Sequence, residues 1–257
     1  MELNLNGKTA LVFGSTQGIG HAIASKFAAE GARVILVGRS ADKLENTLKT
    51  LKNDGHDILV VNQEDVASIE AGAEKLKNQP IDILVNNTGG PNPGLVSEES
   101  WQNFEMAITK QLRCSQTFAT ALLPGMRERK FGRIVNIIST SVKVPIPGLG
   151  VSNTVRGAVA SWAKTLSMEV AADGVTVNNL LPGFIKTGRL QQIIESNAQK
   201  SGRPVNEVSS DMQKSIPAGR FGEPEEMANM ALFLCSEAAA YVNGTSIRID
   251  GGRTGSI

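Results

Sequence analysis

The stretch Thr9–Gly20, TALVFGSTQGIG, decides the fold of this chain. Its first five residues are apolar and partly β-branched, which predicts a buried strand. From Ile19 to Glu30 apolar residues recur at helical spacing, and Gly31 is suited to ending that helix in a left-handed cap. Glycines let the intervening turn approach a diphosphate, while the first N–H groups of the helix favour an anion. The stretch predicts dinucleotide binding; the spacing G-x-x-x-G-x-G leaves an ordinary glycine-rich turn as the alternative.

Strands and helices alternate along the whole chain. The run Ile134–Ile138 is apolar almost throughout, as expected of a parallel strand that helices cover on both faces. We therefore predict one Rossmann-like α/β domain over residues 1–257, a doubly wound parallel sheet of about seven strands with helices on both faces. Further strands are expected at 33–37, 58–61, 81–85, 133–138, 175–178 and 246–249, and helices at 41–52, 68–77, 101–126, 157–172 and 225–235.

One segment departs from this alternation. Residues 188–216 are polar, contain Gly202 and Pro204, and hold one amphipathic piece around Leu190 and Ile194. Long insertions at the ligand edge of such a sheet are often lids over a substrate. We expect a lid here, with a plain surface excursion as the alternative.

Bulk composition excludes several classes of function. A formal net charge of +1 without blocks of like charge argues against a nucleic-acid partner or an acidic membrane surface. The N-terminus lacks the pattern of a secretory leader, and no segment is long and apolar enough to span a bilayer. Cys114 and Cys235 lie too far apart in sequence to suggest a disulfide framework or a metal site. We expect a cytoplasmic protein without a metal ion.

Four further motifs accompany the glycine turn. They are Asn86-Asn87-Thr88-Gly89, Ser139, Pro182-Gly183 and Asp250-Gly251-Gly252. Their order and intervals resemble the short-chain dehydrogenase/reductase family over essentially the whole chain, and its 3-oxoacyl-(acyl-carrier-protein) reductase-like members most. The resemblance implies hydride transfer between NAD(H) or NADP(H) and a small carbonyl or alcohol substrate, usually in a homotetramer, with a homodimer as the alternative.

The resemblance also implies which residues hold the cofactor. Members that prefer NAD place an acid at the end of the second strand, where this chain has Gly38 followed by Arg39. Arginine pairs with a phosphate through two hydrogen bonds, which favours NADP(H) over NAD(H), although Gln17 replaces a second basic residue. Asn62 can hold adenine or serve only as a turn residue. The expected cofactor-binding residues are Gly14, Ser15, Thr16, Gln17, Gly18, Ile19, Gly20, Arg39, Asn62, Gln63, Asn87, Thr88, Gly89, Arg156, Pro182, Gly183, Ile185 and Thr187.

The catalytic positions depart from the family pattern of asparagine, serine and Y-x-x-x-K. Ser139 matches the serine, but Ser152 and Arg156 stand at the tyrosine and lysine positions, and Gln111 at the asparagine position. No shift of register helps, because the single tyrosine is Tyr241. A serine hydroxyl is a far weaker acid than a phenol, and losing a positioned general acid typically costs about 10²–10⁴-fold in rate. This S-N-x-x-R pattern resembles an atypical subgroup of the family.

These residues leave two main hypotheses open. The first is an NADP(H)-dependent oxidoreductase with a non-standard site made of Ser139, Ser152, Arg156 and Gln111, in which Lys110 or Lys143 is a candidate proton donor. The second is a catalytically weak or inactive module that binds NAD(P)(H) as a sensor or as a signal for partner assembly. A dehydratase or isomerase on the same fold is a third alternative.

Overall fold

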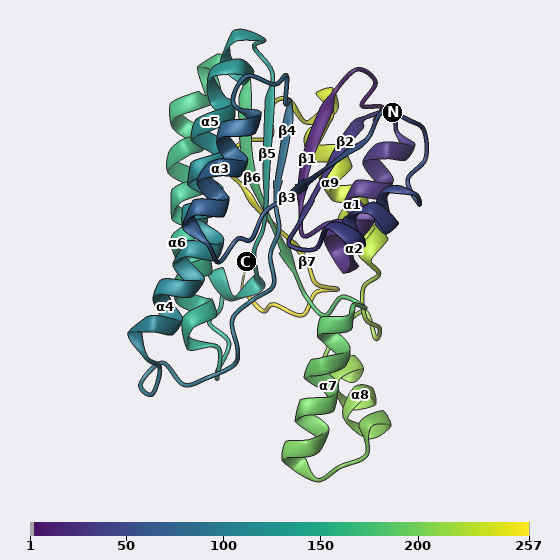
Figure 1. Ribbon diagram of the computed structural model, residues 1–257. Coiled ribbons are helices and arrows are strands. Elements are labelled where there is room, and N and C mark those ends of the chain that lie inside the picture. The colour runs from purple at the N-terminus through teal and green to yellow at the C-terminus, as the bar shows by residue number, and fades with distance from the viewer. Residues whose placement is uncertain (1–2, 257) are drawn as a thin grey trace.

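The computed structural model describes residues 3–256 of the chain (Figure 1). Within them, seven parallel strands form one sheet in the order β3-β2-β1-β4-β5-β6-β7. This sheet confirms the predicted single-domain, doubly wound α/β class. The strands are β1 (Thr9–Phe13), β2 (Arg33–Gly38), β3 (Asp57–Val60), β4 (Ile83–Asn86), β5 (Gly132–Ile137), β6 (Val175–Pro182) and β7 (Ser246–Ile249).

Helices cover both faces of the sheet. In Figure 1, α1, α2 and α9 lie on one face and α3, α5 and α6 on the other. The helices are α1 (Gly18–Ala29), α2 (Ala41–Leu48), α3 (Val66–Leu76), α4 (Trp101–Ile108), α5 (Cys114–Glu128), α6 (Gly150–Val170), α7 (Gly188–Ser201), α8 (Val205–Lys214) and α9 (Pro224–Cys235). No helix within residues 3–256 has the length and hydropathy needed to cross a bilayer.

Each central strand supplies two hydrophobic cores, which explains its continuous apolar sequence. In β1, Ala10 and Val12 pack beneath α1 and α9, while Leu11 and Phe13 pack beneath α3 and α5. The Phe13 ring meets Phe118 of α5 edge-on, with the ring centroids 4.7 Å apart. Because successive side chains of a strand point to opposite faces, burial on both sides leaves no position for a polar residue in the middle of β1.

A ladder of buried polar side chains crosses the other half of the sheet. Asn86 Nδ2 donates to Asn136 Oδ1 (2.8 Å), and Asn136 Nδ2 donates to Asn179 Oδ1 (2.9 Å). Asn179 Nδ2 in turn donates to Ser246 Oγ (3.1 Å). These four residues are register partners on β4, β5, β6 and β7, so the ladder fixes the register of these four strands relative to one another.

Several predicted element boundaries were wrong. The expected helix over 101–126 is interrupted by a π-helical turn, Thr109–Arg113, between α4 and α5. α6 begins at Gly150, not at residue 157, because Val151 and Val155 continue its apolar stripe through polar residues of low helix propensity. α2 ends at Leu48, not at residue 52, and the chain then turns toward Asn53, whose φ is 68°.

The segment 188–216 contains two helices instead of the single amphipathic piece expected. α7 and α8 form a hairpin that projects from the carboxyl edge of the sheet (Figure 1). The hairpin has a small hydrophobic cluster of its own, to which Ile194, Val208 and Phe221 contribute. Backbone hydrogen bonds between Gly222 and residues Phe184 and Lys186 join its two ends.

Candidate dinucleotide and substrate site

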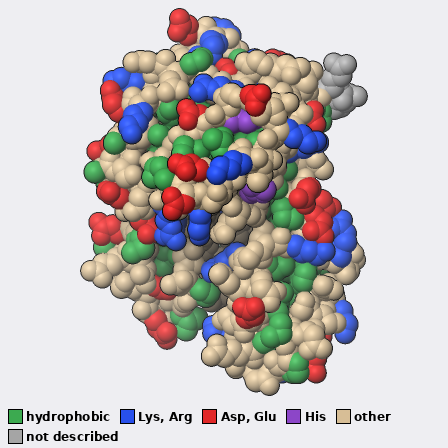
Figure 2. Space-filling model, turned by 45° about the vertical axis from the view of Figure 1, so that its right-hand side comes forward, with side chains coloured by type: hydrophobic (Ala, Val, Ile, Leu, Met, Phe, Trp, Pro, Cys, Tyr) green, Lys and Arg blue, Asp and Glu red, His purple; other side chains and the backbone are tan. Residues whose placement is uncertain are grey.

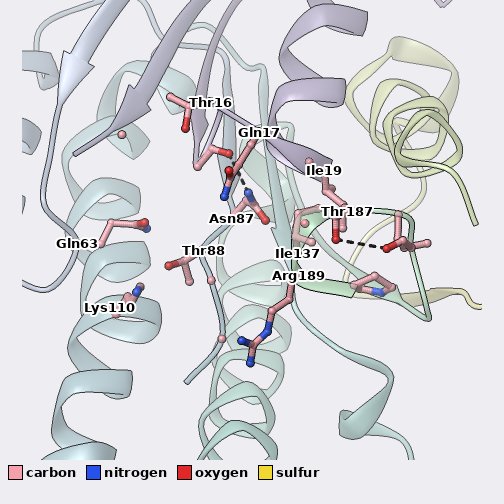
Figure 3. Close-up of a pocket in the computed structure, with 18 of the residues that line it drawn as sticks. Thr16, Gln17, Ile19, Gln63, Asn87, Thr88, Lys110, Ile137, Thr187 and Arg189 are labelled. Carbon is pink, nitrogen blue, oxygen red and sulfur yellow. Dashed lines mark hydrogen bonds between the residues drawn. The ribbon is translucent and has the colours of Figure 1, made fainter. Parts of the chain in front are cut away.

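The main cavity, of about 450 Å³, lies at the carboxyl ends of the strands. It includes residues that follow β1 and β4, the neighbouring strands between which the strand order reverses. Ligands of open α/β sheets bind at this switch point. Figure 3 shows the glycine turn on one side of the cavity and the start of α7 on another. Gln63 and Lys110 lie opposite them.

The glycine turn has the geometry of a phosphate cradle. Gly14 and Gly18 adopt positive φ values of 59° and 56°. A Cβ on Gly14 would lie 2.6 Å from Asn87 Nδ2, and one on Gly20 would collide with the backbone oxygen of Gly14. The N-cap of α1, Gln17, makes no side-chain capping bond, and the first turn holds no acidic residue. These features fit a pyrophosphate bound by the amino end of α1.

The expected cofactor-binding residues converge on this cavity, with two exceptions. Ser15 is fully buried and its Oγ donates to the backbone oxygen of Val37 (3.2 Å), while Gly20 packs against Gly14. Both therefore support the turn from behind. The residues that line the cavity are Gly14, Thr16, Gln17, Gly18, Ile19, Arg39, Asn62, Gln63, Asn87, Thr88, Gly89, Arg156, Pro182, Gly183, Ile185 and Thr187.

The residue after β2, Arg39, is positively charged, and neither of its neighbours in sequence is acidic. Arg39 is exposed at the cavity rim, directly before Ser40, the N-cap of α2. The acidic residue among the lining, Glu64, is engaged by Lys110, whose Nζ lies 2.6 Å from Glu64 Oε1. Hydrogen bonding and charge from Lys110, with a smaller effect of Arg39, lower the pKa of Glu64. Glu64 is thus neutralised by its partner, and Arg39 remains available for an anion.

Asn62 acts in the structure as a turn residue. Its Oδ1 accepts a hydrogen bond from the backbone N–H of Glu64 (3.1 Å), and its own N–H donates to Ser68 Oγ (3.0 Å). The Asn62 side chain is exposed at the cavity, with the amide nitrogen unused by these bonds. The two alternatives for Asn62 are therefore compatible with each other.

The segment after β4 is tied to the glycine turn. Asn87 Nδ2 donates to the backbone oxygens of Phe13 (3.3 Å) and Gly14 (3.4 Å). Beside it, Thr88 Oγ1 and Gln111 Nε2 are buried without a hydrogen-bond partner among the described residues. Both residues line a second cavity of about 20 Å³, which is large enough for one water molecule.

Of the four expected catalytic residues, Arg156 lines the main cavity. It is 8% exposed, and its Nη1 donates to the backbone oxygens of Ile137 (3.0 Å) and Ile138 (2.7 Å). Burial, and secondarily the charge of Arg189, lower its pKa from 12.5 to about 10. The guanidinium therefore stays charged at neutral pH and fixes the end of β5.

The other three expected catalytic residues are not among the residues that line the main cavity. Ser139 caps the short 3₁₀ turn Thr140–Val142, its Oγ accepting the N–H of Ser141 (3.0 Å). Ser152 is buried on α6, one turn before Arg156. Gln111 lies in the π-helical turn and lines the smaller cavity. α6 packs against both of these turns, so the four residues come from adjoining elements.

Comparison with known proteins agrees with this geometry. Residues 14–254 match the sequence profile of the family described as enoyl-(acyl carrier protein) reductase. The 3-oxoacyl-[acyl-carrier-protein] reductase FabG of Aquifex aeolicus is 35% identical over 98% of this chain and 99% of its own length. The chain belongs to the short-chain dehydrogenase/reductase family.

Solved structures of this short-chain dehydrogenase/reductase family contain NADP or NADPH. L-sorbose reductase from Gluconobacter frateurii, complexed with NADPH and L-sorbose, is 31% identical, with a TM-score of 0.93 and full coverage of both chains. A putative NAD(P)-dependent gluconate 5-dehydrogenase from Beutenbergia cavernae, with bound NADP at low occupancy, is 30% identical, with a TM-score of 0.90 and full coverage. Both matches extend over the nucleotide turn and the α7–α8 hairpin of this chain.

The family assignment leaves the source of a proton open, because the only tyrosine of the sequence, Tyr241, is fully exposed and away from the lining of both cavities. Lys143 is exposed after the 3₁₀ turn. Lys110 lines both cavities, but its Nζ is paired with the carboxylate of Glu64 at 2.6 Å. Within residues 3–256, no group of three or more His, Cys, Asp and Glu could hold a metal ion.

Sequence reasoning missed several residues of the cavity in this short-chain dehydrogenase/reductase. Phe184, Leu190 and Ile193 line it from the segment after β6 and from α7. Arg189 lines it as well and donates from Nη2 to the backbone oxygen of Pro91 (3.3 Å). A signal was present in the sequence: an arginine in the first turn of α7 has no acidic residue at the i±3 or i±4 positions.

Proposed function

We propose that this short-chain dehydrogenase/reductase transfers a hydride between NADP(H) and a carbonyl or alcohol substrate, using a non-standard set of catalytic residues. The observation that carries the proposal is the joint presence of Arg39, the glycine turn and the buried Arg156 in one cavity. Arg39 would pair with a 2′-phosphate, and the amino end of α1 with the pyrophosphate. NADP-bound neighbours of the same fold support this preference over NAD(H).

The side chains present would orient and polarise the substrate. When bound, NADPH supplies the hydride. Arg156 remains charged at neutral pH, so it can hold ribose hydroxyls and stabilise negative charge that develops on a carbonyl oxygen. Ser139 and Ser152 can donate a hydrogen bond but are weak acids. We infer that the proton comes from solvent, which makes turnover slow on unactivated ketones.

Two neighbouring parts of the chain would complete the site. Gln111 and Thr88 have unpaired buried polar atoms beside the 20 Å³ cavity, where a water molecule would satisfy both and join the cavity to the main site. The α7–α8 hairpin, residues 188–216, would act as the substrate lid, since Leu190 and Ile193 of α7 already line the main cavity.

The test combines binding and turnover. Calorimetry with NADPH and NADH measures the cofactor step, and the decrease of NADPH absorbance with a panel of ketones and aldehydes measures the chemistry. We expect tight NADPH binding and a slow reduction that Ser139→Ala lowers, while the exposed Lys143→Ala leaves it unchanged. NADPH binding without turnover on any member of the panel would favour the sensor or partner module. Absence of binding to either nucleotide would reject the proposal entirely.

A further inference from the structure

Two arginines meet where the loop after β4 passes the beginning of α7. Arg156 Nη2 lies 3.4 Å from the position that a Cβ on Gly90 would take. Arg189 Nη2 donates to the backbone oxygen of Pro91, the next residue of the same loop. Figure 3 shows the Arg189 side chain pointing into the space beside Thr88. Both arginines line the main cavity.

Neither guanidinium has an acidic partner among residues 3–256. The ion pairs in this part of the chain include neither arginine, and Glu64, the acidic residue of the lining, is occupied by Lys110 at 2.6 Å. Arg156 uses Nη1 for two carbonyl oxygens, while its Nε and Nη2 make no hydrogen bond within the described chain. Figure 2 shows Lys and Arg side chains at the hollow between the main body and the lower lobe.

Such an arrangement is unfavourable until an anion arrives. The buried charge of Arg156 loses solvation without a counter-ion, and the two hydrogen bonds of its Nη1 offset only part of this cost. The second positive charge adds repulsion, and Arg189 contributes to lowering the pKa of Arg156. Arg189 also lies on the lid helix, where one hydrogen bond to Pro91 leaves most of its donors free. An anion placed between the two arginines would relieve both costs at once.

We propose that Arg189, with the field of Arg156, binds a carboxylate of the substrate, so that the compound reduced in this cavity is an oxo acid. The inference rests on the proposed function and adds its substrate class. A guanidinium and a carboxylate form paired charge-assisted hydrogen bonds, and Arg189 presents its planar group for this purpose. Phe184, Leu190 and Ile193 line the same cavity and would contact a short apolar portion of the acid.

The cofactor is the other source of anionic oxygen in this cavity. Its pyrophosphate fits the amino end of α1, and its 2′-phosphate fits Arg39, so Arg189 is left for the substrate. If Arg189 instead held a phosphate of the cofactor, its removal would weaken NADP⁺ binding and leave the preference for acids intact. The experiment therefore has to measure the affinities of the cofactor and of the acids with the same variants.

The test compares acids with their uncharged esters. Calorimetry measures the binding of pyruvate, acetoacetate and levulinate, and of their methyl esters, to protein saturated with NADP⁺. The variants are Arg189→Ala and, as a control on the same helix, the exposed Lys200→Ala, which removes an equal charge away from the cavity. We expect at least one acid to bind about tenfold more tightly than its ester to the wild type and to Lys200→Ala. In Arg189→Ala the acid and its ester should bind with about equal affinity, while the NADP⁺ affinity changes by less than about twofold.

Three results would overturn the inference. They are equal affinity of wild type for acid and ester, no binding of any of the acids, and a loss of NADP⁺ affinity in Arg189→Ala with the acid preference retained. If NADP⁺ itself does not bind, the proposed function fails separately. The acid–ester comparison is then made on the protein alone, where it still decides the role of Arg189.

Discussion

Arg156 holds the end of β5 through Ile138: its Nη1 donates to the backbone oxygen of Ile138 at 2.7 Å, and also to that of Ile137 at 3.0 Å. The residue is thus part of the scaffold as well as of the cavity wall. Arg156→Ala removes these bonds from a buried position, so we expect the free energy of unfolding to fall by about 1–3 kcal/mol. Urea denaturation measures this loss, and calorimetry measures a parallel loss of NADPH affinity. An unchanged stability would contradict the scaffold role; the exposed Lys143→Ala is the control.

Arg39 separates the two nicotinamide cofactors in this site. Arg39→Ala should weaken NADPH binding by about 10- to 100-fold, because a charge-assisted pair with the 2′-phosphate is lost. NADH lacks this phosphate, so its affinity should change little. Titration of both nucleotides against wild type and variant gives the comparison. Equal losses for both would mean that Arg39 does not meet the 2′-phosphate.

Restoring the family's catalytic pair tests the position of α6. Ser152 and Arg156 are one turn apart on this helix, as a tyrosine and a lysine would be. The double change Ser152→Tyr with Arg156→Lys should raise the rate of ketone reduction by about tenfold or more, because a phenol is a far better acid than a serine hydroxyl. Ser152→Tyr alone is the control for bulk. A flat rate in a folded double variant would show that α6 does not aim residue 152 at the substrate.

The asparagine ladder predicts a large loss of unfolding free energy when its central residue, Asn136, is replaced by alanine. Asn136→Ala leaves Asn86 Nδ2 and Asn179 Oδ1 without their partner in a buried setting. Each buried group that loses its hydrogen-bond partner lowers the free energy of unfolding by about 1–3 kcal/mol. The terminal change Ser246→Ala, at a half-buried position, should cost much less. Urea denaturation measures both variants. Equal, small losses would mean that strand packing, and not the ladder, holds these four strands together.

Glu226, in the first turn of α9, makes the stability of the fold depend on pH. Hydrogen bonds from Arg220, then from the N–H of Glu223, lower the pKa of Glu226 from 4.5 to about 2. Since the folded pKa is the lower one, the carboxylate stabilises the fold fully above pH 4.5, and this contribution disappears as the pH falls toward 2. Glu226→Gln should cost less than about 1 kcal/mol at pH 7, because solvent screens the half-exposed pair. The difference in unfolding free energy between wild type and Glu226→Gln should narrow as the pH of the denaturation experiment is lowered toward 2. A constant difference would contradict the role of this carboxylate.

The sequence predicted the sheet and the tight glycine turn after β1 well, because each rests on local constraints. The turn Gly14–Gly20 needs glycines where a Cβ would meet Asn87 or the backbone, and both faces of β1 need apolar residues. The part of the cavity lined by α7 depends on tertiary placement. Arg189 reaches Pro91, and Arg156 comes close to Gly90, only through the tertiary placement of α7 and α6 beside the loop after β4. In sequence, the surroundings of Arg189 are those of a polar surface helix.

The π-helical turn and the start of α6 were missed for a related reason. A π-helical turn has no sequence pattern that differs from an α-helix, so Gln111 shifts relative to its neighbours without a local signal. The first two turns of α6 contain Asn153 and Thr154, whose weak helix propensity is overridden by the packing of Val151 and Val155. The positions of Ser139 and Ser152 relative to each other follow from the packing of α6 against the turn Thr140–Val142.

The hairpin of α7 and α8 keeps most of its apolar contacts to itself, through Ile194, Val208, Phe221 and their neighbours. Residues of this hairpin can therefore be replaced with little disturbance to the packing of the sheet beneath α1 and α9. Under the proposed function, exchanging this hairpin as one unit would change the substrate that the protein accepts and leave the glycine turn as it is. Grafting residues 188–216 between relatives is the corresponding route for an engineer.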